Sequence, residues 1–252
     1  MGDAMKRILL AGTALLALTA AQPTLAADAP VYKGPAPIAA AALFNWSGFY
    51  IGINGGYAWG NATLSEAPPP AYNGPPDFSY RPNGFQGGLH AGVNWQASAL
   101  VFGIEGELGY LGLSGSQQFP PYVGVRTAAD SVAATSGGWF ASIAGRVGFA
   151  VNNFLLYAKG GGIWANIGNS FTDTDPIGLT LVAGTTVSGR TGWLAGAGVE
   201  VAVNPNLTAR IDWTHYDFGT ASHTATASNA VLYTFRHRLT ADSVRLFLSW
   251  KM

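Results

Sequence analysis

The sequence predicts an all-β fold, namely an eight-stranded antiparallel up-and-down transmembrane β-barrel with four long external loops. Three observations support this fold class. Eight segments alternate apolar residues with small or polar ones, which is the period-two pattern of a strand. In four of these segments, two aromatic residues stand ten positions apart on the apolar phase. The connections between segments alternate long and short, as in outer-membrane barrels.

The aromatic spacing matches the thickness of a membrane. Ten steps along a strand cover about 33 Å, and a tilt of about 40° projects this length to about 25 Å, the height of the lipid-facing band in outer-membrane barrels. We therefore predict membrane girdles formed by the spaced pairs and by three tryptophans on the same phase of other segments: Phe49, Trp59, Phe85, Trp95, Trp139, Phe149, Phe154, Trp164, Trp193, Trp213 and Trp250.

The first 26 residues have the pattern of a secretory signal peptide. Lys6 and Arg7 precede an apolar run at 8–21, which is too short to span a bilayer. Small residues then occupy the −3 and −1 positions of a cleavage site after Ala26. We predict that residues 1–26 are removed.

A short proline-rich segment follows. Residues 27–44 place Pro30, Pro35 and Pro37 among small residues, which disfavours a helix or a central strand. We interpret 27–44 as a flexible periplasmic lead-in and 45–252 as the barrel, with no second domain.

Each predicted strand is bounded by turn residues or by a change of pattern. The strands cover 48–60, 85–96, 101–110, 139–149, 154–164, 193–201, 207–214 and 243–252. The long connections are 61–84, 114–138, 165–189 and 219–239, and the tight ones are 96–99, 151–153 and 204–206. Upstream of the last strand, at 231–239, the apolar residues fall on the opposite phase, which predicts a bulge or break at 240–242.

The charged residues indicate which phase faces lipid. A soluble barrel would also alternate, with its apolar phase inside, but only 10% of these residues are charged, whereas a soluble domain carries about 25%. Within the strands, the charges fall on the polar phase, and a Lys or Arg facing lipid at mid-depth costs about 2–4 kcal/mol. We predict that the polar phase lines the lumen and forms a charge network from Glu105, Glu107, Arg146, Lys159, Glu200, Arg210, Asp212 and Arg245. This network either plugs the barrel or surrounds a narrow hydrated pore.

Composition excludes several other classes of protein. The chain has no Cys, so neither a thioether lipid anchor nor a disulfide framework is available. Its formal net charge is zero, which gives no support for nucleic-acid binding. The four His are scattered, so we predict no metal site and no cofactor.

Catalytic chemistry has weak support. His215 lies near Asp217, Ser222 and His223, but we interpret this group as a polar cluster at a loop base rather than a Ser-His-acid arrangement. Glu105 and Glu107 share a face and are interpreted as structural ion-pair partners rather than as a glycosidase pair. No catalytic residue is assigned.

The connection 61–84 carries several prolines with aromatic residues between them, including Tyr72, Phe78 and Tyr80. Exposed aromatic residues on a semi-rigid loop suit recognition, and a protective loop is the alternative. No loop partner is assigned.

Several segments resemble a known family. They are Val31-Tyr32-Lys33, the run from Phe44 to Gly52, Leu155 to Gly161, Tyr216 to Gly219, and Val244 to Lys251. Together they resemble the alphaproteobacterial outer-membrane immunogenic proteins, which are porin-family surface antigens with an OmpA/OmpX-like barrel. The resemblance implies a Gram-negative outer-membrane location, with outer-membrane lipids and lipopolysaccharide as partners. It also implies that the barrel-assembly machinery reads the last strand, although here Met252 stands where the family has an aromatic residue.

The predicted function is that of a structural, porin-like outer-membrane barrel contributing to envelope integrity and surface presentation. Both chain ends are expected in the periplasm, since the tight turns belong on that side. The alternatives are a small-solute diffusion channel and, in a different class, a lipid-modifying outer-membrane enzyme.

Overall fold

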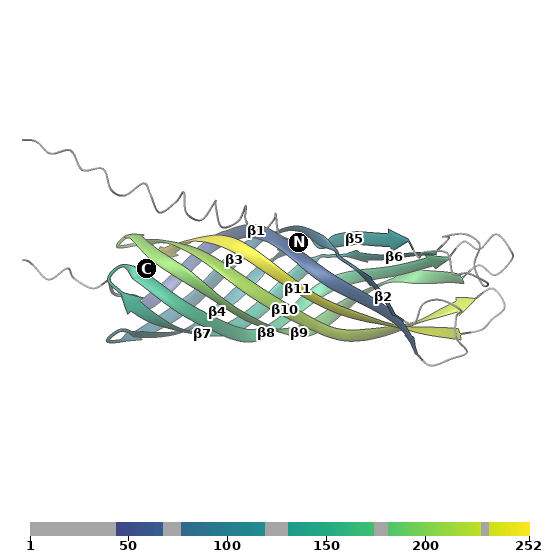
Figure 1. Ribbon diagram of the computed structural model, residues 1–252. Helices are drawn as coiled ribbons and strands as arrows, with labels where there is room; N and C mark the ends of the chain where they lie inside the picture. Colours follow the sequence, from purple (N-terminus) through teal and green to yellow (C-terminus); the bar gives the residue numbers. More distant parts are fainter. Residues whose placement is uncertain (1–43, 68–76, 119–130, 174–180, 228–231) are drawn as a thin grey trace, which may run out of the picture. The chain divides into compact units, whose positions relative to one another are not determined.

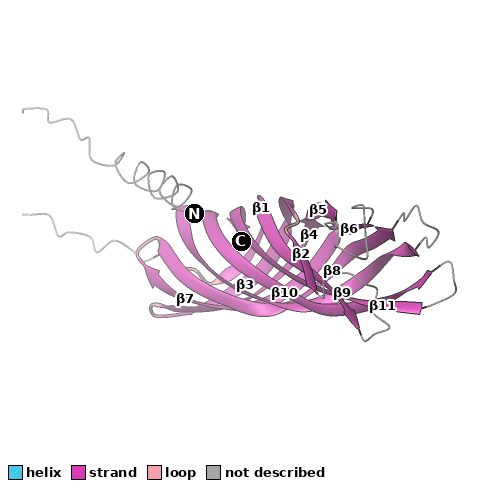
Figure 2. Cartoon of the chain, turned by 45° about the vertical axis from the view of Figure 1, so that its right-hand side comes forward, coloured by secondary structure: helices cyan, strands magenta, loops and turns pink. Residues whose placement is uncertain are grey.

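A computed structural model describes residues 44–67, 77–118, 131–173, 181–227 and 232–252 of the chain. Every regular element in these ranges is a β-strand (Figures 1 and 2). Within the same ranges, no helix is long and apolar enough to cross a membrane. The predicted signal peptide and nearly all of the predicted lead-in lie outside the described residues.

Eight long strands close into a barrel. They are β1 (Gly48–Ala67), β3 (Asn83–Ala97), β4 (Leu100–Leu111), β7 (Trp139–Val151), β8 (Phe154–Asp173), β9 (Leu181–Asn204), β10 (Leu207–Ala227) and β11 (Leu232–Lys251). Each pairs antiparallel with the next in this order, and β11 pairs with β1. The strands run obliquely around the barrel (Figure 1). The predicted eight-stranded antiparallel barrel is confirmed.

The tight connections lie where the sequence predicts them. Ala97 pairs with Leu100 and Val151 pairs with Phe154, so two residues make each turn. Ser98 and Asn152 have positive φ values of 58° and 55°, as two-residue hairpin loops require. We call the end of the barrel that carries these turns the turn end.

The opposite end differs from the prediction of four long loops. The strands β1, β8, β9, β10 and β11 continue well past the aromatic positions, and three short strands join them: β2 (Asp77–Tyr80), β5 (Ser114–Gln118) and β6 (Ser131–Ser136). We call this continuation the extension. Much of each predicted loop is therefore paired strand, and the remainder lies outside the described residues.

The predicted bulge at 240–242 is wrong. β11 pairs with β1 in one unbroken register from Lys251 opposite Tyr50 to Thr234 opposite Ala67. The register shift lies instead on the neighbouring strand β10, between Asp217 and Thr220, where Gly219 has a φ of +64°.

The change of apolar phase on β11 has another cause. Odd-numbered residues face the interior along the whole strand: Arg245 and Ser249 at the turn-end half, Phe235 and Leu239 in the extension. In the extension the exterior carries polar residues, so the interior can be apolar. The phase inversion thus marks where the outer face stops being apolar.

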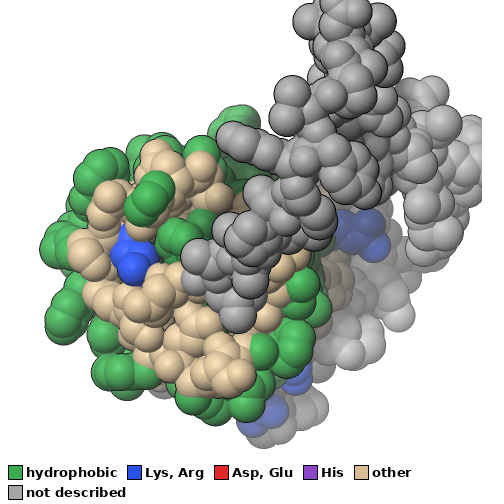
Figure 3. Space-filling model, turned by 90° about the vertical axis from the view of Figure 1, so that its left-hand side faces the viewer, with side chains coloured by type: hydrophobic (Ala, Val, Ile, Leu, Met, Phe, Trp, Pro, Cys, Tyr) green, Lys and Arg blue, Asp and Glu red, His purple; other side chains and the backbone are tan. Residues whose placement is uncertain are grey.

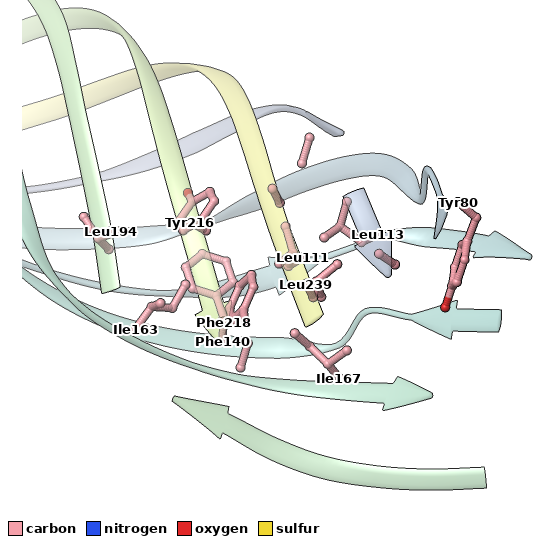
Figure 4. Close-up of a cluster of buried hydrophobic side chains, with 14 of the residues drawn as sticks. Tyr80, Leu111, Leu113, Phe140, Ile163, Ile167, Leu194, Tyr216, Phe218 and Leu239 are labelled. Atoms are coloured by element: carbon pink, nitrogen blue, oxygen red, sulfur yellow. The ribbon is translucent and has the colours of Figure 1, made fainter. Parts of the chain in front are cut away.

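The interior of the extension holds an apolar cluster of side chains, which we call the extension cluster (Figure 4). Its larger members are Leu64, Tyr80, Leu111, Leu113, Phe140, Ile163, Ile167, Leu194, Tyr216, Phe218, Phe235 and Leu239. Tyr80, expected on an exposed recognition loop, is instead buried here from β2. This burial removes it from any surface role.

Candidate functional site: the barrel lumen

The apolar phase and the polar phase of the strands lie on opposite sides of the barrel wall. All eleven aromatic residues proposed for the girdles are exposed on the outer surface. Viewed from the turn end, hydrophobic side chains surround the ring and one Lys or Arg side chain is visible within it (Figure 3). Leu156 and Trp164 of β8 are exposed while Leu155 and Lys159 are buried, as the assignment of Lys159 to the lumen requires.

The eight charged residues proposed for the lumen are all buried. They come from six strands: Glu105 and Glu107 from β4, Arg146 from β7, Lys159 from β8, Glu200 from β9, Arg210 and Asp212 from β10, and Arg245 from β11. Four acids meet four bases, so the set has no net formal charge. We call these eight residues the charge network.

Glu105 is the centre of one half of the network. Its Oε2 accepts hydrogen bonds from Arg210 Nη1 at 2.7 Å and from the Tyr50 hydroxyl at 2.9 Å. Arg146 Nη1 lies 3.8 Å from the same oxygen, and Arg146 Nη2 donates to Glu200 Oε2 at 2.6 Å. Charge-assisted bonds of this length are strong. Strands on opposite sides of the barrel are thereby tied together.

Asp212 is the centre of the other half. It accepts a hydrogen bond from Lys159 Nζ at 2.6 Å and one from the Tyr157 hydroxyl at 3.0 Å. Arg245 Nε lies 3.5 Å from Asp212 Oδ1, and Arg245 Nη1 donates to Glu107 Oε1. The two halves adjoin on β10, where Arg210 and Asp212 share the inner face.

Aromatic rings support the cations of the network. The Arg210 guanidinium carbon lies 3.8 Å from the centroid of Phe247, and that of Arg146 lies 4.3 Å from the centroid of Tyr157. Such contacts contribute about 2 kcal/mol or more when desolvated. Sequence reasoning missed these rings, although Tyr50, Tyr157 and Phe247 stand on the polar phase of their strands, which was a usable signal.

Inward-facing glycines make room for the large lumen side chains. A Cβ on Gly92 would lie 2.4 Å from the Tyr50 hydroxyl oxygen, and one on Gly52 would lie 2.6 Å from the His90 ring. His90, predicted to face the lumen, is buried there and hydrogen-bonds Ser249 at 2.8 Å. The lumen is therefore packed by alternating small and large residues.

A second apolar cluster fills the lumen at the turn end. Trp46, which precedes β1, is only 2% exposed and packs with Val101, Leu155, Tyr157 and Ala202. Its backbone N–H donates to Gln96 Oε1 at 2.7 Å, and Phe44 packs edge-on to its ring at 4.7 Å between centroids. We call this group the turn-end cluster. No pattern in the sequence predicted that the chain before β1 folds into the barrel mouth.

The polar residues weighed for catalysis lie elsewhere. His215 Nδ1 is 2.9 Å from Asp242 Oδ1, not paired with Asp217, and its ring lies between Trp193 and Trp213 on the outer face. Asp217 pairs with Arg238. Ser222 is exposed beyond the register shift, and the His223 side chain lies outside the described residues. Among the described residues, no cluster of His, Cys, Asp and Glu could hold a metal ion.

A closed antiparallel barrel with an apolar outer band and a charged, packed interior is a transmembrane barrel of the outer-membrane class. Comparison with known proteins agrees. Residues 12–236 match the family described as outer membrane protein beta-barrel domain, and the chain belongs to that family.

Two named relatives are similar over most of their length. The chain is 32% identical to a 31 kDa outer-membrane immunogenic protein of Brucella melitensis, covering 85% of this chain and 88% of the relative. It is 26% identical to a 25 kDa outer-membrane immunogenic protein of Brucella abortus, covering 98% of each. The resemblance noted in the sequence is confirmed, and the protein is an outer-membrane protein.

A solved structure with the same fold is the outer membrane protease OmpT of Escherichia coli. It has a TM-score of 0.50 at 9% identity, covering 83% of this chain and 98% of that one. At this identity the likeness concerns the fold alone.

Proposed function

We propose that this protein is a structural outer-membrane barrel whose filled lumen does not conduct solutes, and that it contributes envelope integrity and a surface for recognition. One observation carries the proposal. From the turn end to the extension, the interior is occupied in succession by the turn-end cluster, the charge network and the extension cluster. An eight-stranded barrel is just wide enough for side chains to fill it.

The packing argues against the small-solute channel. The charged side chains that could line a pore are instead bonded to one another across it, for example Glu105 to Arg210 and Lys159 to Asp212. Opening a path would separate buried ion pairs, and leaving one buried partner uncompensated costs about 3–5 kcal/mol.

Planar-bilayer recording of the refolded mature chain tests the proposal. We expect no steady open-pore conductance, because each of the three filled regions must open for ions to pass. The double variant Phe44→Ala, Trp46→Ala should also remain closed, since the charge network and the extension cluster are intact. Steady conductance of the wild-type protein at open-pore size would refute the plugged barrel and support the channel.

No catalytic role is proposed. His215 has Asp242 as its partner, at the level of the outward tryptophans and away from Ser222 in the strand register. The relatives are named as immunogenic proteins, which favours a surface antigen over an enzyme.

We also propose the orientation and the lipid contacts of the barrel. Short turns lie on the periplasmic side of outer-membrane barrels, which supports a periplasmic turn end and an extension outside the cell. The outward aromatic residues then contact outer-membrane lipids and lipopolysaccharide. The barrel-assembly machinery reads β11, whose last aromatic residue is the exposed Trp250.

A further inference from the structure

Arg190 of β9 is a cation in the extension interior, apart from the charge network. It pairs in the strand register with Ala165 of β8 and precedes the outward Trp193 by three residues. It is 4% exposed, and the inner faces of the neighbouring strands there carry members of the extension cluster such as Ala165 and Ile167.

Within the described part of the chain, Arg190 has no counter-ion. Its Nε and Nη1 atoms are buried and have no hydrogen-bond partner there. The buried acids of the described ranges, Glu105, Glu107, Glu200 and Asp212, are all bonded to the four bases of the charge network. Arg190 thus differs from Arg146, Lys159, Arg210 and Arg245, which each have a carboxylate.

Polar groups from other strands share this interior. Tyr80 of β2 is close enough to Arg190 to interact with it electrostatically. The Tyr80 hydroxyl is 2.6 Å from Thr135 Oγ1 of β6, and Thr135 Oγ1 donates to Asn169 Oδ1 of β8 at 3.2 Å. Because each hydroxyl has one hydrogen and Thr135 donates to Asn169, the Tyr80 hydroxyl donates to Thr135, and neither hydrogen is free for the guanidinium's surroundings.

An unpaired buried charge is strongly unfavourable unless something compensates it. The Nε–H and Nη1–H groups of Arg190, which have no partner within the described residues, can each donate to an oxygen of a carboxylate or phosphate. We propose that Arg190 anchors a binding site for a small oxyanion, a phosphate or carboxylate group, inside the extension.

The test uses the full mature chain folded in detergent micelles with selectively labelled arginine. Inorganic phosphate, acetate and chloride are titrated at matched ionic strength while the Nε–Hε resonance of Arg190 is followed by NMR. We expect saturable shifts of this resonance with phosphate or acetate and none with chloride. Absence of a saturable shift with both oxyanions would overturn the proposal.

Variants locate the binding. Arg190→Gln should weaken oxyanion binding by about tenfold or more, because it removes charged hydrogen bonds, whereas Arg190→Lys should keep part of it. Arg238→Gln is the matched control, since Arg238 is an exposed arginine on the outer face of β11. Heat-modifiable gel mobility shows whether each variant is folded. If folded Arg190→Gln binds phosphate and acetate as the wild type does, the site is elsewhere and the assignment is wrong. The wild-type titration remains decisive if the variants do not fold.

Discussion

A single carboxylate can hold several strands of this barrel together. Glu105 of β4 contacts Tyr50 of β1, Arg210 of β10 and, at longer range, Arg146 of β7. These partners are far apart in the sequence, and neither β1 nor β10 is a neighbour of β4 in the barrel. The attraction acts in a dry interior, where Coulombic interactions are less screened than in water.

We therefore expect Glu105→Gln to destabilise the folded protein by about 3–5 kcal/mol, because it leaves the buried Arg210 without its carboxylate partner. Urea denaturation in detergent, followed by tryptophan fluorescence, measures the change. Arg238→Gln should shift the midpoint very little, since that ion pair is exposed. A Glu105→Gln midpoint equal to that of the wild type would show that the network adds nothing to stability.

At the scale of the element, each strand combines small and large inward residues so that its neighbours fit. Gly92 of β3 faces the lumen, where a Cβ would lie 2.4 Å from the Tyr50 hydroxyl oxygen and 2.6 Å from the Ile104 carbonyl oxygen. Gly145 of β7 faces outward, and the atom nearest to a Cβ there would be the Gly160 carbonyl oxygen at 4.0 Å. A side chain at Gly92 would therefore clash with its neighbours, whereas Gly145 has room for a methyl group.

Gly92→Ala should destabilise the barrel by about 1–3 kcal/mol, because the extra methyl group must displace backbone or a buried tyrosine. Gly145→Ala, the matched control, should be neutral or stabilise by up to about 1 kcal/mol through reduced entropy of the unfolded chain. Denaturation midpoints of both variants measure these two changes in stability. If both alanines have the same effect, strand propensity rather than lumen packing accounts for the glycines.

At the scale of the whole molecule, the polarity of the outer face and that of the interior both change along the length of the barrel. Between the aromatic residues its outer face is apolar and its interior charged, whereas in the extension the interior is apolar and exposed positions such as Ser222 and Arg238 are polar. We propose that this inversion marks the membrane boundary.

Arginine substitutions along the outer face should therefore differ by depth. Leu246→Arg, at a position that is 65% exposed in the middle of the apolar band, should cost about 2–4 kcal/mol in lipid bilayers. Ser222→Arg, on the exposed face of the β10 extension, should cost close to nothing. Folding equilibria in phospholipid vesicles measure both, and equal costs would place the boundary elsewhere.

Much of the fold could be predicted because lipid selects residues locally. The period-two pattern located all eight barrel strands and three tight turns, and the segregation of charge told inside from outside even for β8, where Leu155 and Leu156 are adjacent. The extension was missed because its inner and outer faces exchange polarity. On β11 this exchange looked like a break, although the hydrogen-bonded ladder to β1 continues through it.

The sequence by itself determined that this chain is a membrane barrel and which side chains enter its lumen. The reason is that the polarity of each residue matches the medium on its own side of the barrel wall, lipid outside or the polar lumen inside. Only the tertiary structure decided which charges meet, such as Glu105 with Arg210, that Trp46 fills the turn end, and that Arg190 lies apart from the acids of the described lumen. Contacts across the lumen join strands that are distant along the chain, and no local pattern encodes the distance between them.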